Sequence, residues 1–259
     1  MPPFAARFAK LVQWGTVSTG LPEQKGNIIV FFMSPPFLSR KAYSPPPGIN
    51  LVDGLTLTLS RCHEFCGPAR RSLALMLAAR LDGPVLWIRP DWTRAQIMAQ
   101  GARDYIDPGR LIVVEPGRAD DILWCMEESL RAGVVPMVVA ECDAPPALTP
   151  IRRLHLAAET GSGVGSLKPL GLILTPGDGG AQGVESRWHL APRHRSDTRS
   201  WLLHRRRARL APPAAWVLTW QNGAAKATPV AHQVTQLSDR PTQLPQPARV
   251  SSNHRSAQA

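Results

Sequence analysis

Cysteine is scarce in this sequence, which argues against a disulfide-stabilised fold. The 259 residues include four scattered cysteines, Cys62, Cys66, Cys125 and Cys142. This usage predicts a reducing, cytoplasmic setting. The spacing Cys62-His63-x-x-Cys66 is weakly metal-like, but no second Cys/His pair follows nearby, so we expect no bound metal.

Long apolar segments are also missing. The longest early run, Ile28 to Met33, is too short to cross a bilayer. No basic start followed by an apolar stretch and a small-residue cleavage site is present, so we expect no secretory signal and no membrane partner.

Acidic residues are few relative to basic ones. The chain has 19 aspartates and glutamates against 30 lysines and arginines, which gives a net charge of +11. This excess predicts an anionic partner, but charge alone does not choose between nucleic acid, an acidic protein and a membrane surface. The apolar content of 44% is enough for a sizeable core.

The sequence patterns of common catalytic sites are absent too. We find no Ser-His-Asp spacing, no paired carboxylates and no H-E-x-x-H motif, and the seven histidines are scattered. We therefore expect no catalytic residues.

The two ends of the chain differ in composition from its middle. Residues 1–48 lack sustained periodicity and are broken by prolines, so we expect a flexible N-terminal segment. Residues 222–259 are rich in proline, glutamine and serine, and we expect a disordered tail. Residues 49–221 are expected to form one domain.

Within that domain, short apolar runs alternate with amphipathic segments. Strands are expected at 55–59, 83–88, 110–115, 134–141 and 170–174, and helices at 69–81, 93–102, 119–133 and 151–161. The alternation predicts an α/β fold with a mostly parallel sheet covered on both faces. Residues 186–221 then give three strand-like runs without helices, which predicts an antiparallel meander at the sheet edge.

The stretch CGPARRSLALML, from Cys66 to Leu77, occupies the position of a phosphate-binding loop. A working loop reads G-x-x-x-x-G-K-[ST], with a lysine that reaches the outer phosphates. Counted from Gly67, the last three positions are Ser72, Leu73 and Ala74, and none of them fits. If the loop is two residues shorter, Arg71 and Ser72 replace the Lys-Ser pair.

In that shortened alignment, Arg70 takes the place of the last glycine, where a side chain obstructs the close approach of phosphate. Glu141 ends an apolar strand, as the magnesium-orienting acid of an ATPase does. Gly67, Arg70, Arg71, Ser72 and Glu141 are thus the positions of a degenerate nucleotide site. We expect an ordinary strand-to-helix turn there, with no nucleotide cofactor.

Arginine is concentrated between residues 187 and 209, where only one acidic residue, Asp197, occurs. The eight arginines are Arg187, Arg193, Arg195, Arg199, Arg205, Arg206, Arg207 and Arg209. A charged edge strand also prevents edge-to-edge aggregation, but this cluster exceeds that need. We predict that it binds DNA or an acidic protein partner.

Tryptophans occur throughout the domain. We expect Trp87 and Trp124 in the core because they lie in apolar patterns. The tryptophans of the meander allow two interpretations, namely exposed rings for base stacking or protein contact, and one buried face per strand.

The segment from about residue 50 to 221 resembles the ImuA family, RecA-like proteins of bacterial translesion synthesis. Three marks in the expected order carry the resemblance: His63-Glu64 before Gly67-Pro68, Trp124-x-x-Glu127-Glu128, and Arg152-Arg153-Leu154 after an acidic strand. The stretch MVVAECDAPPALTP also resembles the magnesium-site strand of RecA, with Glu141 at the acidic position.

This resemblance implies a RecA-like domain and an accessory role in damage-induced (SOS) mutagenesis. The implied partners are ImuB, an inactive relative of Y-family polymerases, and an error-prone DNA polymerase III alpha-type subunit, with RecA and DNA as further partners. The departures at Arg70 to Ala74 weigh against RecA's ATPase, and Ser162 to Pro169 is too short for its DNA-binding loops.

We therefore expect a non-catalytic adaptor. Two alternatives stay open: an active P-loop ATPase that uses Arg71, Ser72 and Glu141, and a cell-division inhibitor similar to SulA, which is also related to RecA.

A late translation start is a further expectation. Nothing before Met33 resembles the family, and Glu23 to Asn27 (EQKGN) can be encoded by GAACAAAAGGGGAAC. That sequence is similar to the direct repeat bound by the SOS repressor LexA in alphaproteobacteria. Residues 1–32 are then a translated promoter.

Overall fold

The computed structural model describes residues 46–52, 54–196, 198–221 and 223–230. The predictions for residues 1–45 and 231–259, including the start at Met33, lie outside this part of the chain.

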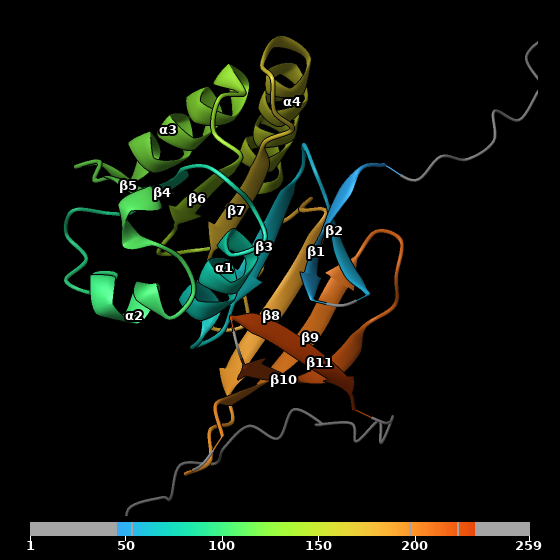
Figure 1. Cartoon of the computed structure of the whole chain (residues 1–259). Coiled ribbons are helices and arrows are strands. Elements are labelled where there is room, and N and C mark those ends of the chain that lie inside the picture. The colour runs from blue at the N-terminus through green and yellow to red at the C-terminus, as the bar shows by residue number, and fades with distance from the viewer. Residues whose placement is uncertain (1–45, 53, 197, 222, 231–259) are drawn as a thin grey trace, which may run out of the picture. The chain divides into compact units, whose positions relative to one another are not determined.

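A mixed nine-stranded sheet organises the described residues (Figure 1). Its strands, in order across the sheet, are β11 (Ala224–Pro229), β10 (Ala214–Gln221), β9 (Ser200–Ala208), β8 (Ser186–Pro192), β3 (Cys62–Cys66), β7 (Leu170–Leu174), β6 (Met137–Glu141), β4 (Val85–Ile88) and β5 (Leu111–Val114). Pairing is parallel from β8 to β5 and antiparallel from β8 to β11. The predicted α/β class, with a mostly parallel sheet and antiparallel strands at its C-terminal end, is confirmed.

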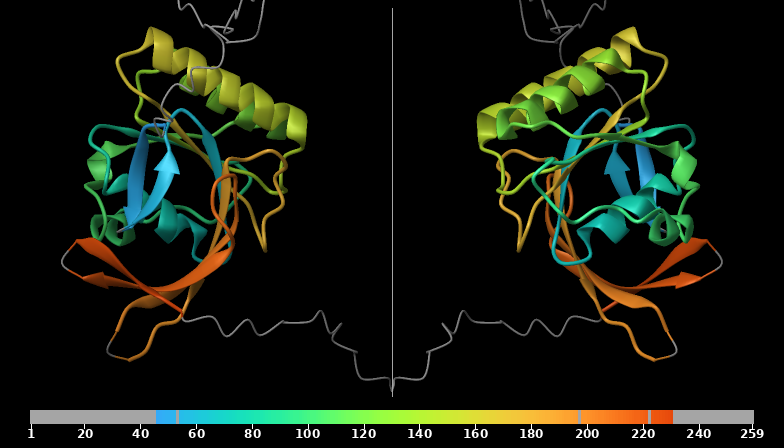
Figure 2. Two further views of the ribbon diagram at one scale, coloured as in Figure 1. Left: turned by 90° about the vertical axis from the view of Figure 1, so that its right-hand side faces the viewer. Right: turned by 90° about the vertical axis from the view of Figure 1, so that its left-hand side faces the viewer.

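Helices cover both faces of the parallel part of the sheet, and a hairpin packs on one of these faces. Helix α1 (Arg70–Ala78) and the hairpin β1 (Gly48–Val52) and β2 (Leu55–Thr58) pack on one face and share one core. Helices α3 (Ala119–Ala132) and α4 (Leu148–Val164) lie side by side on the other face and form a second core (Figure 2). The short helix α2 (Ala99–Arg103) follows a loop beyond β4. Among the described helices, none is both long and apolar enough to cross a membrane.

The sequence patterns do not distinguish the central strand β3 from the preceding strand β2. The predicted strand 55–59 forms β2 of the hairpin, whereas CHEFC is the strand that enters the main sheet and is buried throughout. Its two polar residues find partners there. His63 donates from Nε2 to the Thr58 carbonyl (2.9 Å) and accepts at Nδ1 from Ser186 (2.6 Å).

Glu64, beside His63, is fully buried and binds four donor groups. The Thr175 hydroxyl donates to its Oε1 at 2.7 Å, the amides of Gly180 and Ala181 donate at 2.8 and 3.1 Å, and Arg187 forms an ion pair with it. A buried carboxylate needs such a complete set of partners. Glu64 therefore ties β3 to the loop after β7 and to β8.

The helix expected at 93–102 is wrong over most of its length, because only Ala99–Arg103 is helical. The carbonyl of Thr93 accepts a hydrogen bond from Arg89 at 2.8 Å, and that of Ala95 accepts one from Arg71 at 3.1 Å. These carbonyls are the acceptors that a helix would need. Two side-chain contacts from elsewhere in the fold therefore hold the segment as a loop.

The core prediction for Trp124 is also wrong, since its side chain is 58% exposed. The buried line of α3 contains Ile122, Met126 and Leu130. Trp124 is two residues from Ile122, which turns it about 200° around the helix. Trp87, by contrast, is fully buried as predicted.

The expected boundary at residue 221 is wrong as well. Residues Ala224–Pro229, assigned to the disordered tail, form strand β11, which pairs with β10 over six residues. Ala225 packs into the core although the segment contains no large apolar residue. The pairing partner, more than the local sequence, makes this segment a strand.

Candidate functional site

The turn between β3 and α1 lies at the carboxyl edge of the parallel strands, where α/β proteins bind their ligands. Gly67 has φ +87°, a conformation that favours glycine. A Cβ at this position would lie 2.6 Å from the Leu190 carbonyl oxygen and 2.7 Å from Nε2 of His189. Glycine is needed here because the turn packs closely against β8, and a phosphate is not required to explain it.

The amides of this turn are directed into the protein. Gly67 donates to the Gly177 carbonyl at 2.8 Å, Ala69 to Leu190 at 3.0 Å, and Arg70 back to Gly67 at 3.3 Å. Pro68 has no N–H to offer. A phosphate cradle needs these groups to point toward the ligand, so the turn lacks the main element of a nucleotide site.

Arg71 and Glu141 bind each other. The Arg71 Nε donates to one carboxylate oxygen of Glu141 at 2.8 Å, and its Nη2 donates to the other at 2.5 Å. The Trp87 indole donates to the same carboxylate at 2.8 Å. The side chain of Glu141 is 8% exposed and that of Arg71 is 26% exposed. Arg71 therefore binds both oxygens of the carboxylate that would hold magnesium in an ATPase.

The other positions of the degenerate site also have internal roles. Arg70 donates to the Gly67 carbonyl at 3.2 Å, and its burial lowers the pKa of the guanidinium. Burial raises the pKa of Tyr105, and the neighbouring Ser72 side chain offsets part of that rise. The cleft lined by Arg70, Arg71 and Glu141 measures about 170 Å³. Ligand pockets for drug-sized molecules run from roughly 300 to 1,000 Å³, so the cleft is small for a nucleotide.

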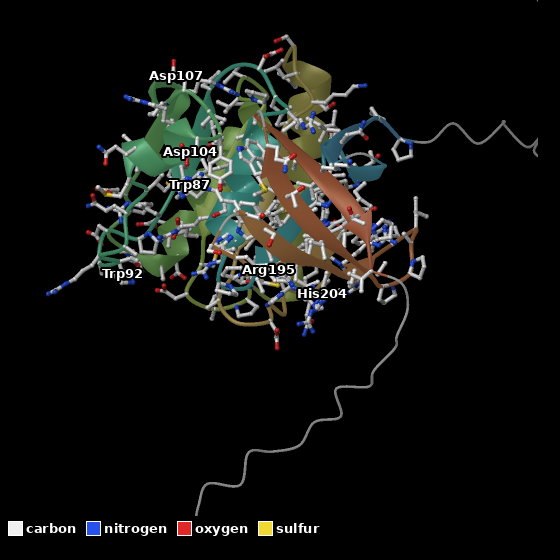
Figure 3. All side chains as sticks on the ribbon, turned by 60° about the horizontal axis from the view of Figure 1, so that its bottom comes forward. Trp87, Trp92, Asp104, Asp107, Arg195 and His204 are labelled. Carbon is white, nitrogen blue, oxygen red and sulfur yellow. The ribbon has the colours of Figure 1, made fainter. Side chains whose placement is uncertain are left out.

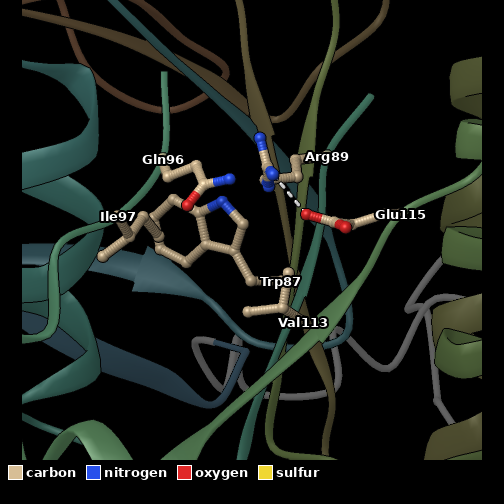
Figure 4. Close-up of a pocket in the computed structure, with 6 residues that line it drawn as sticks. All are labelled: Trp87, Arg89, Gln96, Ile97, Val113 and Glu115. Carbon is tan, nitrogen blue, oxygen red and sulfur yellow. Dashed lines mark hydrogen bonds and ion pairs between the residues drawn. The ribbon is translucent and has the colours of Figure 1, made fainter. Parts of the chain in front are cut away.

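A second pocket, of about 270 Å³, lies beyond the ends of β4 and β5. Gln96 and Ile97 lie beside the Trp87 ring, and Arg89 forms an ion pair with Glu115 at its rim (Figure 4). The Arg89 guanidinium also donates to Thr93 and Ala95. Its charge is thus already paired. The sequence patterns do not predict this pocket, because they indicate a helix over residues 93–97.

The fold separates the eight arginines that the sequence groups together. Arg187 pairs with buried Glu64 and has a side chain only 19% exposed. Arg205 lies over the rings of Trp188 and Trp216, 5.7 and 5.2 Å from their centroids, and donates to the Pro212 carbonyl. These two arginines therefore serve packing.

Three further arginines form ion pairs at the surface with acids from distant parts of the chain. Arg199 pairs with Asp104, Arg206 with Asp178, and Arg209 lies 3.6 Å from Glu185. Arg193, Arg195 and Arg207 are exposed and have no ion-pair partner among the residues described. Figure 3 locates Arg195 and His204 at the antiparallel end of the sheet, away from Trp87. The effective positive charge of this region is thus smaller than its sequence suggests.

The meander tryptophans lie on the covered face of the sheet. Trp188 and Trp201 are buried, and Trp216 and Trp220 pack against the same core. Trp220 also contacts Tyr105, with ring centroids 4.8 Å apart. The interpretation with one buried face per strand is therefore the correct one, and these four rings do not form an exposed stacking platform.

Cys62 and Cys66 lie four residues apart on β3, a separation of about 13 Å along a strand. One metal ion cannot bind both thiols at that separation. Burial raises the pKa of the Cys66 thiol to about 12, which keeps it protonated. In the described part of the chain, no group of three or more histidine, cysteine or acidic side chains is arranged to hold a metal.

No model of a known protein family matches the chain, and no curated protein matches it significantly.

Proposed function

We propose that this chain is a non-catalytic, RecA-like accessory protein of damage-induced error-prone translesion DNA synthesis. In this role it is an adaptor for ImuB and an error-prone DNA polymerase III alpha-type subunit, with RecA and DNA as further partners. The proposal joins the ImuA resemblance to one structural observation, the pair between Arg71 and Glu141.

The strand order supports the RecA-like part of the proposal. Strands β3 and β6 flank β7 and run parallel to it, so the degenerate turn and Glu141 meet at one edge of the sheet. A nucleotide site of this kind requires the loop and the acid to be adjacent. Here the same two positions are adjacent but bind each other.

The pair between Arg71 and Glu141 is what favours an adaptor over an ATPase. Magnesium binding would require Glu141 to give up a two-pronged ion pair and a hydrogen bond from Trp87. No lysine is present in the turn to hold the outer phosphates. A chain that keeps the sheet and loses the cradle retains its surfaces for binding other proteins.

Two measurements test this function. The full chain should show no ATP turnover with single-stranded DNA present, and it should co-purify with an ImuB homologue, which we expect a neighbouring gene to encode. ATP turnover that is abolished in Glu141→Gln would establish the ATPase alternative instead. A neighbouring gene unrelated to Y-family polymerases, together with no co-purification, would leave the SulA-like alternative.

A further inference from the structure

The antiparallel end of the sheet has a second face that no described helix covers. In β8 to β10, Trp188, Trp201 and Trp216 point into the core beside α1 and the hairpin. The alternate residues therefore point the other way. We call this side of β8–β11 the open face.

An apolar row crosses the middle of the open face. Ala191 pairs with Leu202 across β8 and β9, and Leu202 pairs with Val217 across β9 and β10. All three are half-buried, as expected for side chains that have neighbours in the sheet and no described helix above them. The row continues to Thr228 on β11.

A β-bulge places two adjacent arginines at one end of the open face. The register between β8 and β9 shifts so that Trp188 pairs with Arg205 and Arg187 pairs with Arg207. Arg206 is the extra residue, and the shift brings Arg207 to the side of His204. Both are exposed, and Arg206 pairs with Asp178, whereas Arg207 has no ion-pair partner among the residues described. Without the bulge, Arg207 would point to the covered face with Arg205.

The opposite end of the open face is also cationic. Arg193 continues the ladder of β8 by donating its amide to the Ser200 carbonyl at 2.8 Å. Ser200 pairs with Thr219, which pairs with Lys226 of β11. Six residues of strand separate Ser200 from Arg206, so the two cationic ends lie roughly 20 Å apart.

The open face thus has an apolar centre between two positive ends, and this pattern indicates which kind of partner it can bind. A nucleic acid presents phosphates along its whole length and would leave Leu202 and Val217 without apolar contacts. The tryptophan rings of β8–β10 lie on the covered face and cannot stack on bases here. A protein segment with apolar residues between acidic ends matches both features.

The chain itself does not supply such a segment. Residues 1–45 contain five basic residues and one acid, and residues 231–259 contain three arginines and one acid. Both segments are positive, as is a second copy of the chain with its net charge of +11. Like charges oppose docking at the cationic ends.

We propose that the open face binds an acidic amphipathic segment of a partner protein, with its apolar residues on Leu202 and Val217 and its carboxylates on Arg207 and Arg193. This inference rests on the adaptor function proposed above and names the surface that serves it.

The test uses the full chain and three fluorescein-labelled probes. One is a twelve-residue peptide with glutamates at both ends and alternating leucine and valine in its centre. The second has the same composition in scrambled order, and the third is a twenty-base-pair DNA duplex. We expect the first peptide to bind at least tenfold more tightly than the scrambled one.

Substitutions then locate the binding. Arg207→Glu should weaken binding of the peptide at least tenfold, and Val217→Thr, which keeps the side-chain shape, should weaken it several-fold. Arg152→Glu on α4 is the matched control, because Arg152 is exposed and changes the net charge equally. It should leave the affinity unchanged, and thermal unfolding should confirm that all variants are folded.

Three outcomes would overturn the inference: equal binding of both peptides, equal effects of Arg207→Glu and Arg152→Glu, or tighter binding of the duplex with no loss in Val217→Thr. The last would assign the open face to nucleic acid. Since the probes are synthetic, these results do not depend on co-purification with ImuB, and the adaptor role can fail separately.

Discussion

At the scale of single residues, the pair between Arg71 and Glu141 is expected to stabilise the folded protein. Arg71→Ala leaves a nearly buried carboxylate with only the Trp87 indole as a side-chain partner. Removing one partner of a buried ion pair costs about 3–5 kcal/mol, and the partial exposure of Arg71 reduces the expected loss to about 2 kcal/mol.

Glu141→Gln should cost less, because the amide can still accept from Trp87 and the freed arginine can reach water. Urea denaturation of both variants and the double variant would give the coupling between the two residues, expected above ~0.5 kcal/mol. Strictly additive effects would mean that the pair contributes nothing beyond its two members.

His63 gives the fold a pH dependence. Burial is the main cause that lowers its pKa from 6.5 to about 4, and the neutral ring holds Ser186 and the Thr58 carbonyl. Between these two pKa values the unfolded chain binds a proton that the folded chain excludes, so stability falls as pH falls from about 6.5 to 4. The loss from this residue is about 3 kcal/mol over that range.

Denaturant titrations of wild type and His63→Gln at pH 7, 6, 5 and 4 would isolate this contribution. The variant should be less stable at pH 7, and its stability should fall less steeply below pH 6.5. Parallel curves would assign the acid sensitivity to other groups, such as His155, whose pKa burial also lowers.

The site positions could be found from the sequence, but their partners could not. Glu141 was placed at its strand end because the apolar run before it marks a buried strand. The carboxylates that pair with Arg187, Arg199 and Arg206 come from residues 64, 104 and 178, and a local count of charge does not include them. Only the tertiary fold brings these groups together.

At the scale of elements, the contact between α3 and α4 depends on glycine. A Cβ on Gly161 would lie 2.0 Å from the Leu130 carbonyl oxygen, and one on Gly133 would lie 2.1 Å from the carbonyl of Gly161. Gly161→Ala would force the two helices apart. We expect a loss of about 1–3 kcal/mol despite the better helix propensity of alanine.

Gly163→Ala, in the same helix, is the control for this prediction. Its Cβ would meet nothing within 4 Å, so the change should stabilise the protein by up to about 1 kcal/mol. Thermal unfolding of both variants would show opposite shifts. Similar shifts would mean that helix propensity, and not the close packing of α3 on α4, decides the outcome.

Elements with strong apolar periodicity were the predictable ones. The parallel strands and helices α1, α3 and α4 follow from their patterns. Strands β3 and β11 have weak apolar patterns. Buried hydrogen bonds stabilise β3, and pairing with β10 stabilises β11. The loop after β4 was mispredicted because Arg71 and Arg89 bind its carbonyls.

At the scale of the whole described region, the two ends of the sheet differ in how their faces are covered. The parallel end carries both helical layers and the closed pair between Arg71 and Glu141. The antiparallel end is covered on one face only. The accessory role proposed above needs no chemistry at the parallel end.

The central place of β3 has a consequence for biosynthesis. Glu64 finds its partners Thr175 and Arg187 only 111 and 123 residues later in the chain. A ribosome that adds about 5–20 residues per second leaves this strand unpaired for several seconds or more. During that interval the nascent chain exposes a strand that is buried at every position of the folded protein, so a chaperone that shields Cys62–Cys66 would protect the centre of the future sheet.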